Sequence, residues 1–419
     1  MSMPDGPLKI AIVGAGMVGA SCAHFLQRDG HSVTILDPNE PGSGASYGNA
    51  GSISRSSVMP SSSPGLIKRV PKMLMDPTSP LVLRWQYVPR LIPWLMGFLA
   101  NSARHRVERN GEVMGALFRH VLPAYDTLIQ QVGCADLIEP SGALKLYETD
   151  AAFDANAYEC DLMERCGCPF EVIGPDRIRE LEPNLAPIFR HGVFVAGSRH
   201  IKNPQGLVEA VVQAVLRNGG QILKEKVETV EMGAGAKPIV VTNAGRHAVD
   251  LVVVAAGARS GKLANQLGGR LVLDAERGYH VMFPTPEKSV NRYLHFAEGK
   301  FSLSQMQDGV RMTSLVELAS VDAPPDYRRI RRLLPQAARM LPGLSQTEKS
   351  IWMGARPSTP NNVPVIARSP QHESIYFAFG HSHLGMTLGP VTGRLIADLI
   401  AGRETGLDMT PYGAVRPLL

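Results

Sequence analysis

Two apolar runs near the N-terminus flank a segment with helical periodicity. Leu8–Val13 and Ser32–Leu36 are short and rich in β-forming residues, as is typical of buried strands. Between them, apolar residues recur three or four positions apart: Val18, Cys22, Phe25 and Leu26. The pattern predicts a strand, a helix and a second strand in succession.

The remainder of the chain alternates between the two periodicities. Helical spacing predicts helices over residues 105–132 and 151–166, and a further helix with Val391, Leu395 and Leu399 on one face. Period-two or continuous apolar runs predict strands over 251–260, 271–283, 301–316 and 375–379. In the second of these strands four residues alternate onto one face: Arg277, Tyr279, Val281 and Phe283. The mixture predicts an α/β protein with an additional α+β part.

Leu81–Ala100 is the stretch most easily mistaken for a membrane span. Two arginines and two prolines interrupt it, which argues against spanning, since a span needs about 20 mostly apolar residues. A helical hairpin packed on the body of the protein is one interpretation. A surface that dips into the membrane interface is the other, because three of its aromatic residues are of interface-seeking types: Trp85, Tyr87 and Trp94.

Composition narrows the class of protein. The chain has 419 residues, which at about 100–200 residues per domain predicts two or three domains. The net charge of +5 is small and dispersed, which argues against a nucleic-acid partner. The five cysteines form no C-x-x-C pair, so we expect free thiols and no metal site. We expect a cytoplasmic protein without a signal peptide, with peripheral attachment to the inner face of the cell membrane as the alternative.

The predicted strand–helix–strand unit carries a dinucleotide-binding motif. Gly14, Gly16 and Gly19 lie in the loop and the first helical turn, where they allow a tight turn, a close approach to pyrophosphate and helix–strand packing. Asp37 ends the second strand about 20 residues later, in place to bind ribose hydroxyls. The motif predicts a bound dinucleotide. Asp37 argues against NADP, but the motif alone leaves NAD and FAD open.

Two further loops are rich in small residues. Gly42–Ser54 is either a plain surface loop or a loop that lies against phosphate and flavin. Gly380–Gly389 follows a strand and leads into a helix, so the helix N-terminus points N–H groups at a ligand. Such a dipole favours the negative charge of a reduced flavin, and this second loop therefore favours FAD.

Taken together, these motifs resemble the FAD-dependent D-amino-acid oxidase superfamily, and most closely its bacterial D-amino-acid dehydrogenase (small subunit) branch. The resemblance covers nearly the whole chain. It rests on the following residues and segments in this order: Gly14, Gly16, Gly19, Asp37, Gly44–Ser46, Asn49–Gly51, Asn203, Pro204, Gly206, Leu207, Val227, 251–260, Arg277, Gly278, Tyr279, Arg356, Pro357, Thr359, Pro360, Pro364 and 380–389.

The resemblance implies a Rossmann FAD-binding domain of the glutathione-reductase type with an inserted antiparallel-sheet substrate domain. The FAD-binding domain would comprise 1–82, 201–270 and 347–405, the substrate domain 83–200 and 271–346, and the C-terminal tail 406–419. FAD would be held non-covalently. The residues expected to contact it are Gly14, Ala15, Gly16, Met17, Val18, Gly19, Asp37, Pro38, Ser46, Asn49, Ala50, Gly51, Val227, Ala256, Gly257, Gly354, Arg356, Gly380, His381, Leu384, Gly385, Met386 and Thr387.

The reaction that the resemblance implies is oxidation of a D-amino acid, or of a cyclic relative such as hydroxy-D-proline. The Cα hydride passes to flavin N5, water hydrolyses the imino acid to a 2-oxo acid, and a quinone or another carrier takes the electrons. Arg356 is expected to bind the substrate carboxylate, because a guanidinium matches a carboxylate in two parallel hydrogen bonds. Its alternative is a structural ion pair.

Other candidate residues keep two interpretations each. Tyr279 is expected to reach the same carboxylate or to cover the pocket, with a core tyrosine as the alternative, and Arg277 is interpreted as structural. His383 stands where the family has another residue, and it either contacts the substrate or faces solvent. Two other functions compete: an oxygen-using amine oxidase of the glycine or sarcosine type, and a non-catalytic FAD-binding redox protein. The oligomeric state is not predicted.

Overall fold

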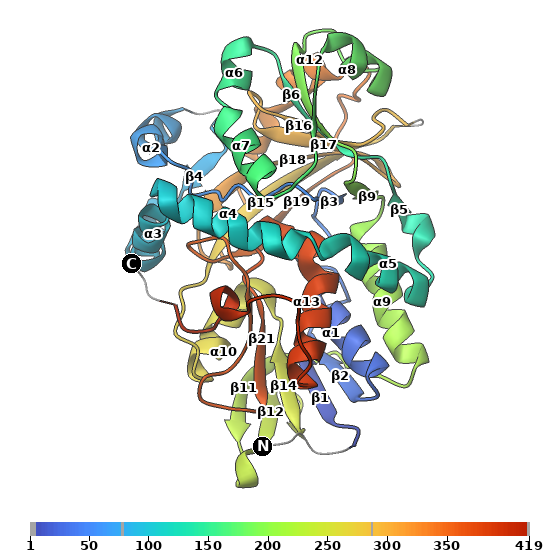
Figure 1. Cartoon of the computed structure of the whole chain (residues 1–419), viewed down its shortest axis with the longest axis vertical. Coiled ribbons are helices and arrows are strands. Elements are labelled where there is room, and N and C mark those ends of the chain that lie inside the picture. Colours follow the sequence, from blue (N-terminus) through green and yellow to red (C-terminus); the bar gives the residue numbers. More distant parts are fainter. Residues whose placement is uncertain (1–5, 77–78, 286–287, 417–419) are drawn as a thin grey trace.

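The computed structural model describes residues 6–76, 79–285 and 288–416, and it forms two lobes, each built around its own sheet (Figure 1). The lower lobe in Figure 1 contains the N-terminal strand, and the upper lobe contains the larger sheet. Chain segments far apart in sequence meet in each lobe. The fold class predicted from the sequence is therefore confirmed.

A six-stranded sheet forms the centre of the lower lobe, in the order β10-β2-β1-β14-β21-β20. All of its neighbouring strands are parallel except the pair β20 and β21. Both faces are covered, which is why its strands are almost continuously apolar. Their bounds are β1 Lys9–Val13, β2 Ser32–Leu36, β10 Gln221–Leu223, β14 Leu251–Val254, β20 Val365–Arg368 and β21 Ile375–Phe379.

Helices cover one face of this sheet and a small antiparallel sheet covers the other. α1 (Met17–Arg28) packs against α13 (Gly385–Ile400) and α9 (Pro204–Arg217). On the other face of the sheet, a second hydrophobic core contains residues of α10 (Ser260–Gln266) and of a three-stranded sheet. That sheet consists of β11 Val227–Met232, β12 Pro238–Thr242 and β13 Arg246–Ala248. The carboxyl ends of β1, β2 and β14 are left open, where α/β proteins bind their ligands.

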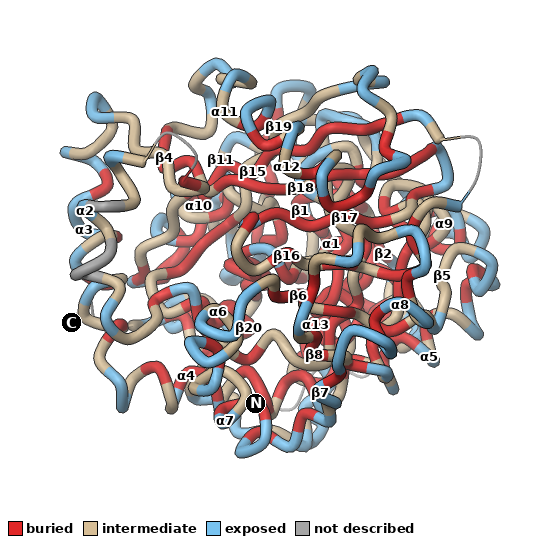
Figure 2. The backbone as a smooth tube through the Cα atoms, turned by 90° about the horizontal axis from the view of Figure 1, so that it is seen from above, coloured by how far each residue is buried: buried red, intermediate tan, exposed pale blue. Residues whose placement is uncertain are grey.

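The upper lobe is built on a nine-stranded sheet in the order β19-β15-β18-β17-β16-β6-β8-β7, with β4 beside β18. Its bounds are β4 Leu81–Leu83, β6 Ala143–Tyr147, β7 Glu171–Ile173, β8 His191–Val195, β15 Asp274–Phe283, β16 Tyr293–Phe296, β17 Phe301–Met306, β18 Gly309–Leu318 and β19 Ser350–Ser358. One face forms a separate core with three short helices: α8 Pro175–Leu181, α11 Arg328–Arg331 and α12 Leu334–Met340. The other face turns toward the lower lobe. Figure 2 shows the strands of this sheet as mostly buried.

The remaining helices flank the two sheets. They are α2 Leu66–Met75, α3 Val88–Ala100, α4 Arg104–Phe118, α5 Val121–Val132, α6 Asp150–Asp154 and α7 Ala157–Arg165. The short strands β3 Ser52–Ile53, β5 Ile138–Glu139 and β9 Arg199–Ile201 make a small sheet between the lobes. Within the described residues no helix is both long enough and apolar enough to cross a membrane. All five cysteines are free thiols.

Strand pairing shifts some of the predicted boundaries. β19 pairs with β15 and β4 pairs with β18, so both belong to the upper sheet although 347–405 and 1–82 were predicted for the FAD-binding domain. α4 and α5 lie in the predicted segment 83–200 but pack into the lower core. The predicted tail 406–419 is packed onto the body: Tyr412 is 1% exposed, and its hydroxyl donates to the carbonyl of Val113. Sequence separation alone does not reveal such long-range pairings.

Candidate active site

A single cavity of about 1670 Å³ lies between the open strand ends of the lower lobe and the upper sheet. It exceeds the roughly 300–1,000 Å³ of ordinary small-ligand pockets, as a dinucleotide together with a substrate requires. Most of the cofactor-binding residues predicted from the sequence line it: Gly14, Ala15, Gly16, Met17, Val18, Asp37, Pro38, Ser46, Asn49, Ala50, Val227, Ala256, Gly257, Gly354, Arg356, His381, Leu384, Gly385, Met386 and Thr387.

The loop between β1 and α1 and the first turn of α1 form a cradle in which two positions have room only for glycine. Gly14 has φ +112°, and a Cβ there would lie 2.5 Å from the carbonyl oxygen of Ala255. A Cβ on Gly19 would lie 2.0 Å from the carbonyl oxygen of Gly14. The N-terminus of α1 carries no capping side chain of its own, although the Ser46 hydroxyl accepts the N–H of Met17 at 3.1 Å. The free N–H groups of this turn suit a pyrophosphate.

Asp37 is fixed at the end of β2, beside this cradle. One of its carboxylate oxygens accepts the N–H of Ala15 at 2.9 Å, and the other accepts the N–H of Asn39 at 2.9 Å. These bonds leave lone pairs on both oxygens for the hydroxyls of a ribose. The residues present therefore fit the adenosine diphosphate half of FAD.

Three residues that were predicted to contact the cofactor are not among the lining residues of the cavity: Gly19, Gly51 and Gly380. Gly19 lets α1 approach β1, as described above. Gly51 has φ +77°, and a Cβ there would lie 2.4 Å from the carbonyl oxygen of Ile201. Gly380 has φ +83° and turns the chain after β21. Each of them shapes the backbone that holds the lining residues.

Arg311 is a functional residue that the sequence did not single out. It lies on β18, is 5% exposed, and donates from Nη1 to the carbonyls of Tyr47 at 2.7 Å and Asn49 at 2.6 Å. Burial lowers its pKa to about 10, so it stays charged. Arg311 thus fastens the loop after Ser46 against the upper sheet. A lone arginine within an apolar strand pattern was the available signal.

The N-terminus of α13 faces the cavity from the lower lobe. This helix has no side-chain cap and no acidic residue in its first turn. The Tyr125 hydroxyl donates to the carbonyl of Met386, and the Thr387 hydroxyl donates to the carbonyl of Ser52 at 3.0 Å. The first turn is thereby held in place with its N–H groups free for an anionic ligand edge.

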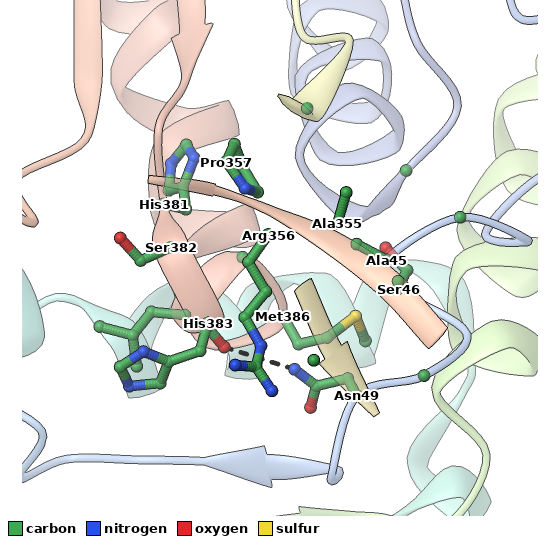
Figure 3. Close-up of a pocket in the computed structure, with 18 of the residues that line it drawn as sticks. Ala45, Ser46, Asn49, Ala355, Arg356, Pro357, His381, Ser382, His383 and Met386 are labelled. Atoms are coloured by element: carbon green, nitrogen blue, oxygen red, sulfur yellow. Dashed lines mark hydrogen bonds between the residues drawn. The ribbon is translucent and has the colours of Figure 1, made fainter. Parts of the chain in front are cut away.

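Arg356 reaches into the cavity from β19 (Figure 3). Its Nη1 donates to the carbonyl of Leu315 at 3.0 Å, which is the hydrogen bond that its guanidinium makes within the described residues. Leu315 has φ +69° at an irregularity in the pairing of β15 and β18, a strained conformation for a branched side chain. That conformation places the carbonyl beside the guanidinium.

Two residues of β15 shape the surroundings of Arg356. A Cβ on Gly278 would lie 2.0 Å from Nη2 of Arg356, so the guanidinium occupies space that only glycine leaves. Glu276 pairs in register with Arg356 and is 5% exposed. Burial lowers the pKa of Arg356, and the charge of Glu276 counteracts this shift. Arg356 is therefore a cation with free donors at the cavity wall.

Tyr279 lies on the opposite face of the sheet, in the upper core. Its hydroxyl donates to Glu317 and accepts the N–H of Asp326 at 3.2 Å, and burial raises its pKa to about 12. Glu317 also pairs with Arg277 at 3.2 Å. The predicted alternation of these side chains is correct, but their face turns away from Arg356. Tyr279 therefore packs in the upper core and also borders the cavity, while Arg277 is paired with Glu317; that the Tyr279 hydroxyl reaches the substrate carboxylate or covers the pocket stays a prediction.

A different tyrosine faces the cavity beside Arg356. Tyr293 on β16 lines the cavity, and its hydroxyl lies 2.7 Å from the Ser302 hydroxyl. His295, two residues further along, shares the same hydroxyl at 3.0 Å through Nδ1. Burial lowers the pKa of His295 to about 3, so the ring is neutral. The alternation of Tyr293 and His295 with two apolar neighbours was the signal that the sequence offered.

His383 lines the cavity next to Arg356 (Figure 3). Its carbonyl accepts the side-chain amide of Asn49 at 3.4 Å. The residue is exposed to the cavity that it lines. Burial, followed by the charge of Arg356, lowers its pKa to about 4. His383 is therefore neutral near pH 7 and faces the cavity.

No cluster of three His, Cys, Asp or Glu side chains suited to a metal ion occurs in the described part of the chain.

Known proteins resemble this chain in sequence and in fold. It is 34% identical over 421 residues to a D-amino-acid oxidase of Bradyrhizobium diazoefficiens, covering 99% of this chain and 100% of the relative. It is 28% identical over 409 residues to a D-amino acid dehydrogenase of Allorhizobium ampelinum, covering 96% of each.

Two solved structures share the fold with a TM-score of 0.75. Glycine oxidase from Geobacillus kaustophilus is 22% identical, covering 98% of this chain and 99% of that one. L-Proline dehydrogenase from P. horikoshii is 18% identical, covering 98% of each chain. The family model described as "FAD dependent oxidoreductase" matches residues 9–399. With its glycine cradle and its two helix N-termini at one cavity, this chain belongs to the FAD-dependent oxidoreductase family DAO.

Proposed function

We propose that the enzyme oxidises a D-amino acid, or a cyclic D-imino acid such as hydroxy-D-proline, to the imino acid, which water converts to the 2-oxo acid. The observation that carries the proposal is Arg356, a half-buried cation whose free donors face the cofactor cavity. The names of the relatives at 34% and 28% identity support the D configuration. Family membership disfavours the non-catalytic alternative.

The side chains around Arg356 divide the tasks of binding a substrate. Arg356 receives the α-carboxylate in a charge-assisted pair of hydrogen bonds, while Leu315 keeps its guanidinium in place. Tyr293 donates a further hydrogen bond to that carboxylate. His383, which is neutral, accepts a hydrogen bond from the substrate amine. FAD, held non-covalently, supplies the hydride-accepting chemistry at its N5 atom.

The decisive measurement is flavin reduction without oxygen by D and L enantiomers, including the hydroxyprolines. We expect bleaching by D members and little by their L partners. Arg356→Ala should lower kcat/KM at least about a hundredfold, mainly through KM, and Arg356→Lys should recover part of it. Arg368→Ala, an exposed arginine on β20, is the matched control. An unchanged KM in Arg356→Ala would refute the carboxylate assignment.

The electron acceptor is proposed to be a quinone or another carrier. A second candidate is oxygen, because the D-amino-acid oxidase relative matches the full length at 34% identity. Comparing peroxide formation under air with reduction of an artificial dye separates the two. Peroxide release at the rate of dye reduction would identify an oxidase, and slow peroxide release with fast quinone reduction would identify a dehydrogenase.

An apolar surface on α2, α3 and the turn Trp85–Tyr87 before α3 supports peripheral binding to the inner face of the cell membrane. Its exposed side chains are Met75, Trp85, Ile92, Met96 and Leu99. Large exposed apolar groups on one side of a protein favour burial in a bilayer interface. Vesicle flotation should recover the protein, and Trp85→Ser should reduce the recovered fraction. Val172→Ser, at a 50% exposed position on β7, is the control.

A further inference from the structure

The lining of the cavity continues from Arg356 along the upper sheet. Strand register places Ser302, His295, Lys145 and Val193 in one row across β17, β16, β6 and β8. All four line the cavity, and we call this part of it the arm. A group bound at Arg356 that points along this row meets first Tyr293 and His295 and then Lys145. This arm therefore receives the side chain of a substrate whose carboxylate is held by Arg356.

An ion pair sits at the end of the row. Nζ of Lys145 lies 2.7 Å from an oxygen of Glu159 and 2.8 Å from the amide oxygen of Asn156. The side chains of Lys145 and Glu159 are 25% and 29% exposed, and both line the cavity. Each keeps a free polar site: Lys145 has a third donor, and Glu159 has its second oxygen. Neither is used in binding the carboxylate or the amine.

The charge balance of this arm disfavours a charged ligand. The pair is neutral as a whole, and His295 is neutral as well. An incoming carboxylate would be attracted by Lys145 but repelled by Glu159. An incoming ammonium would be attracted by Glu159 but repelled by Lys145. Either charge would lose its hydration without a net opposite charge to replace it. An amide or a hydroxyl can bond to both partners at little desolvation cost.

Apolar residues surround the approach to the ion pair. Met163 on α7 and the β8 residues Val193 and Val195 line the same arm. Methylene groups of a substrate stem can pack against them, while the polar end reaches the pair. Resting on the proposed function, we propose that the Lys145–Glu159 pair selects D-amino acids whose side chains end in an uncharged hydrogen-bonding group and rejects side chains of either charge.

The test compares flavin reduction without oxygen by D-glutamine, D-glutamate, D-lysine and D-norleucine. For the unmodified enzyme we expect kcat/KM to be highest with D-glutamine, by about tenfold over the two charged substrates. Glu159→Gln leaves Lys145 unpaired and should raise the D-glutamate to D-glutamine ratio about tenfold. Lys145→Met should raise the D-lysine to D-glutamine ratio similarly. The double variant should return both ratios toward those of the unmodified enzyme.

Glu164→Gln, an exposed position on the same helix, is the matched control and should change neither ratio. Flavin content and Tm report whether each variant folds. Because the two single variants favour substrates of opposite charge, either one alone tests the pair if the other fails to fold. Flavin reduction with unchanged ratios, or a preference of the unmodified enzyme for a charged or apolar substrate, would overturn the subsite and leave the proposed function standing. Absence of reduction by every D-amino acid would overturn both.

Discussion

The two lobes recognise their ligands by different means. In the lower lobe the ligand is recognised mainly by backbone groups. Glycines and helix N-termini form the cofactor site together with the carboxylate of Asp37. In the upper lobe recognition depends on side chains that one sheet face presents, above all Arg356 and Tyr293. Backbone recognition requires particular residue types at particular positions, whereas side-chain recognition requires only that a strand turn the correct face. The two lobes should therefore respond differently to substitution.

The largest effect is expected in the lower lobe. Gly19→Ala would bring a Cβ to 2.0 Å from the carbonyl of Gly14, so α1 must move away from β1 and the phosphate cradle opens. Purified Gly19→Ala should carry less than about a tenth of the flavin of the unmodified protein, measured by its visible absorbance. Gly245→Ala, in the turn between β12 and β13 of the same lobe with nothing within 4 Å of the added carbon, should retain flavin. Full flavin content in Gly19→Ala would contradict the cradle.

Substitution of the corresponding glycine in the upper lobe, Gly278, should weaken substrate binding and leave cofactor binding unchanged. Gly278→Ala would place a Cβ 2.0 Å from Nη2 of Arg356 and displace the guanidinium. We expect KM to rise about ten- to a hundredfold in steady-state assays, with flavin content preserved. Gly343→Ala, which adds a methyl to open space in the same lobe, is the control. Loss of flavin together with an unchanged KM would reverse the division between the lobes.

Much of the lower lobe was predictable, and the upper site was predictable only in part. The β1–α1–β2 unit with Asp37 follows from local pattern, because every requirement lies within one short stretch. Arg356 was found through a family resemblance. The alternation of Tyr279 was predicted correctly, but its contacts stayed open, because period two gives two faces and does not say which one meets Arg356. That choice depends on long-range pairing with β18 and on its irregularity at Leu315.

Substitutions at two tyrosines, Tyr279 and Tyr293, distinguish the two faces of the upper sheet. Tyr279→Phe removes a hydroxyl that is bonded to buried Glu317, and it should lower the free energy of unfolding by about 1–3 kcal/mol with KM unchanged. Tyr293→Phe removes a cavity hydroxyl, and it should raise KM several-fold with little change in Tm. Denaturant unfolding and steady-state kinetics on both variants check this. An increased KM in Tyr279→Phe alone would assign the contact with the substrate carboxylate to Tyr279 and not to Tyr293.

The smallest expected effect concerns a property that both lobes share, the dependence of their stability on pH. His381 in the lower lobe is 2% exposed and His280 in the upper lobe is fully buried, and burial lowers the pKa of each to about 3. The unfolded chain binds a proton near pH 6.5 and the folded chain does not, so protonation favours unfolding. Stability is therefore complete above pH 6.5 and falls as the pH drops toward 3, by about 1.4 kcal/mol per pH unit for each histidine. Tm measured from pH 7.5 to 5 should fall less steeply in His381→Gln and in His280→Gln, by similar amounts. A flatter curve in only one variant would show that the two lobes respond differently to acid.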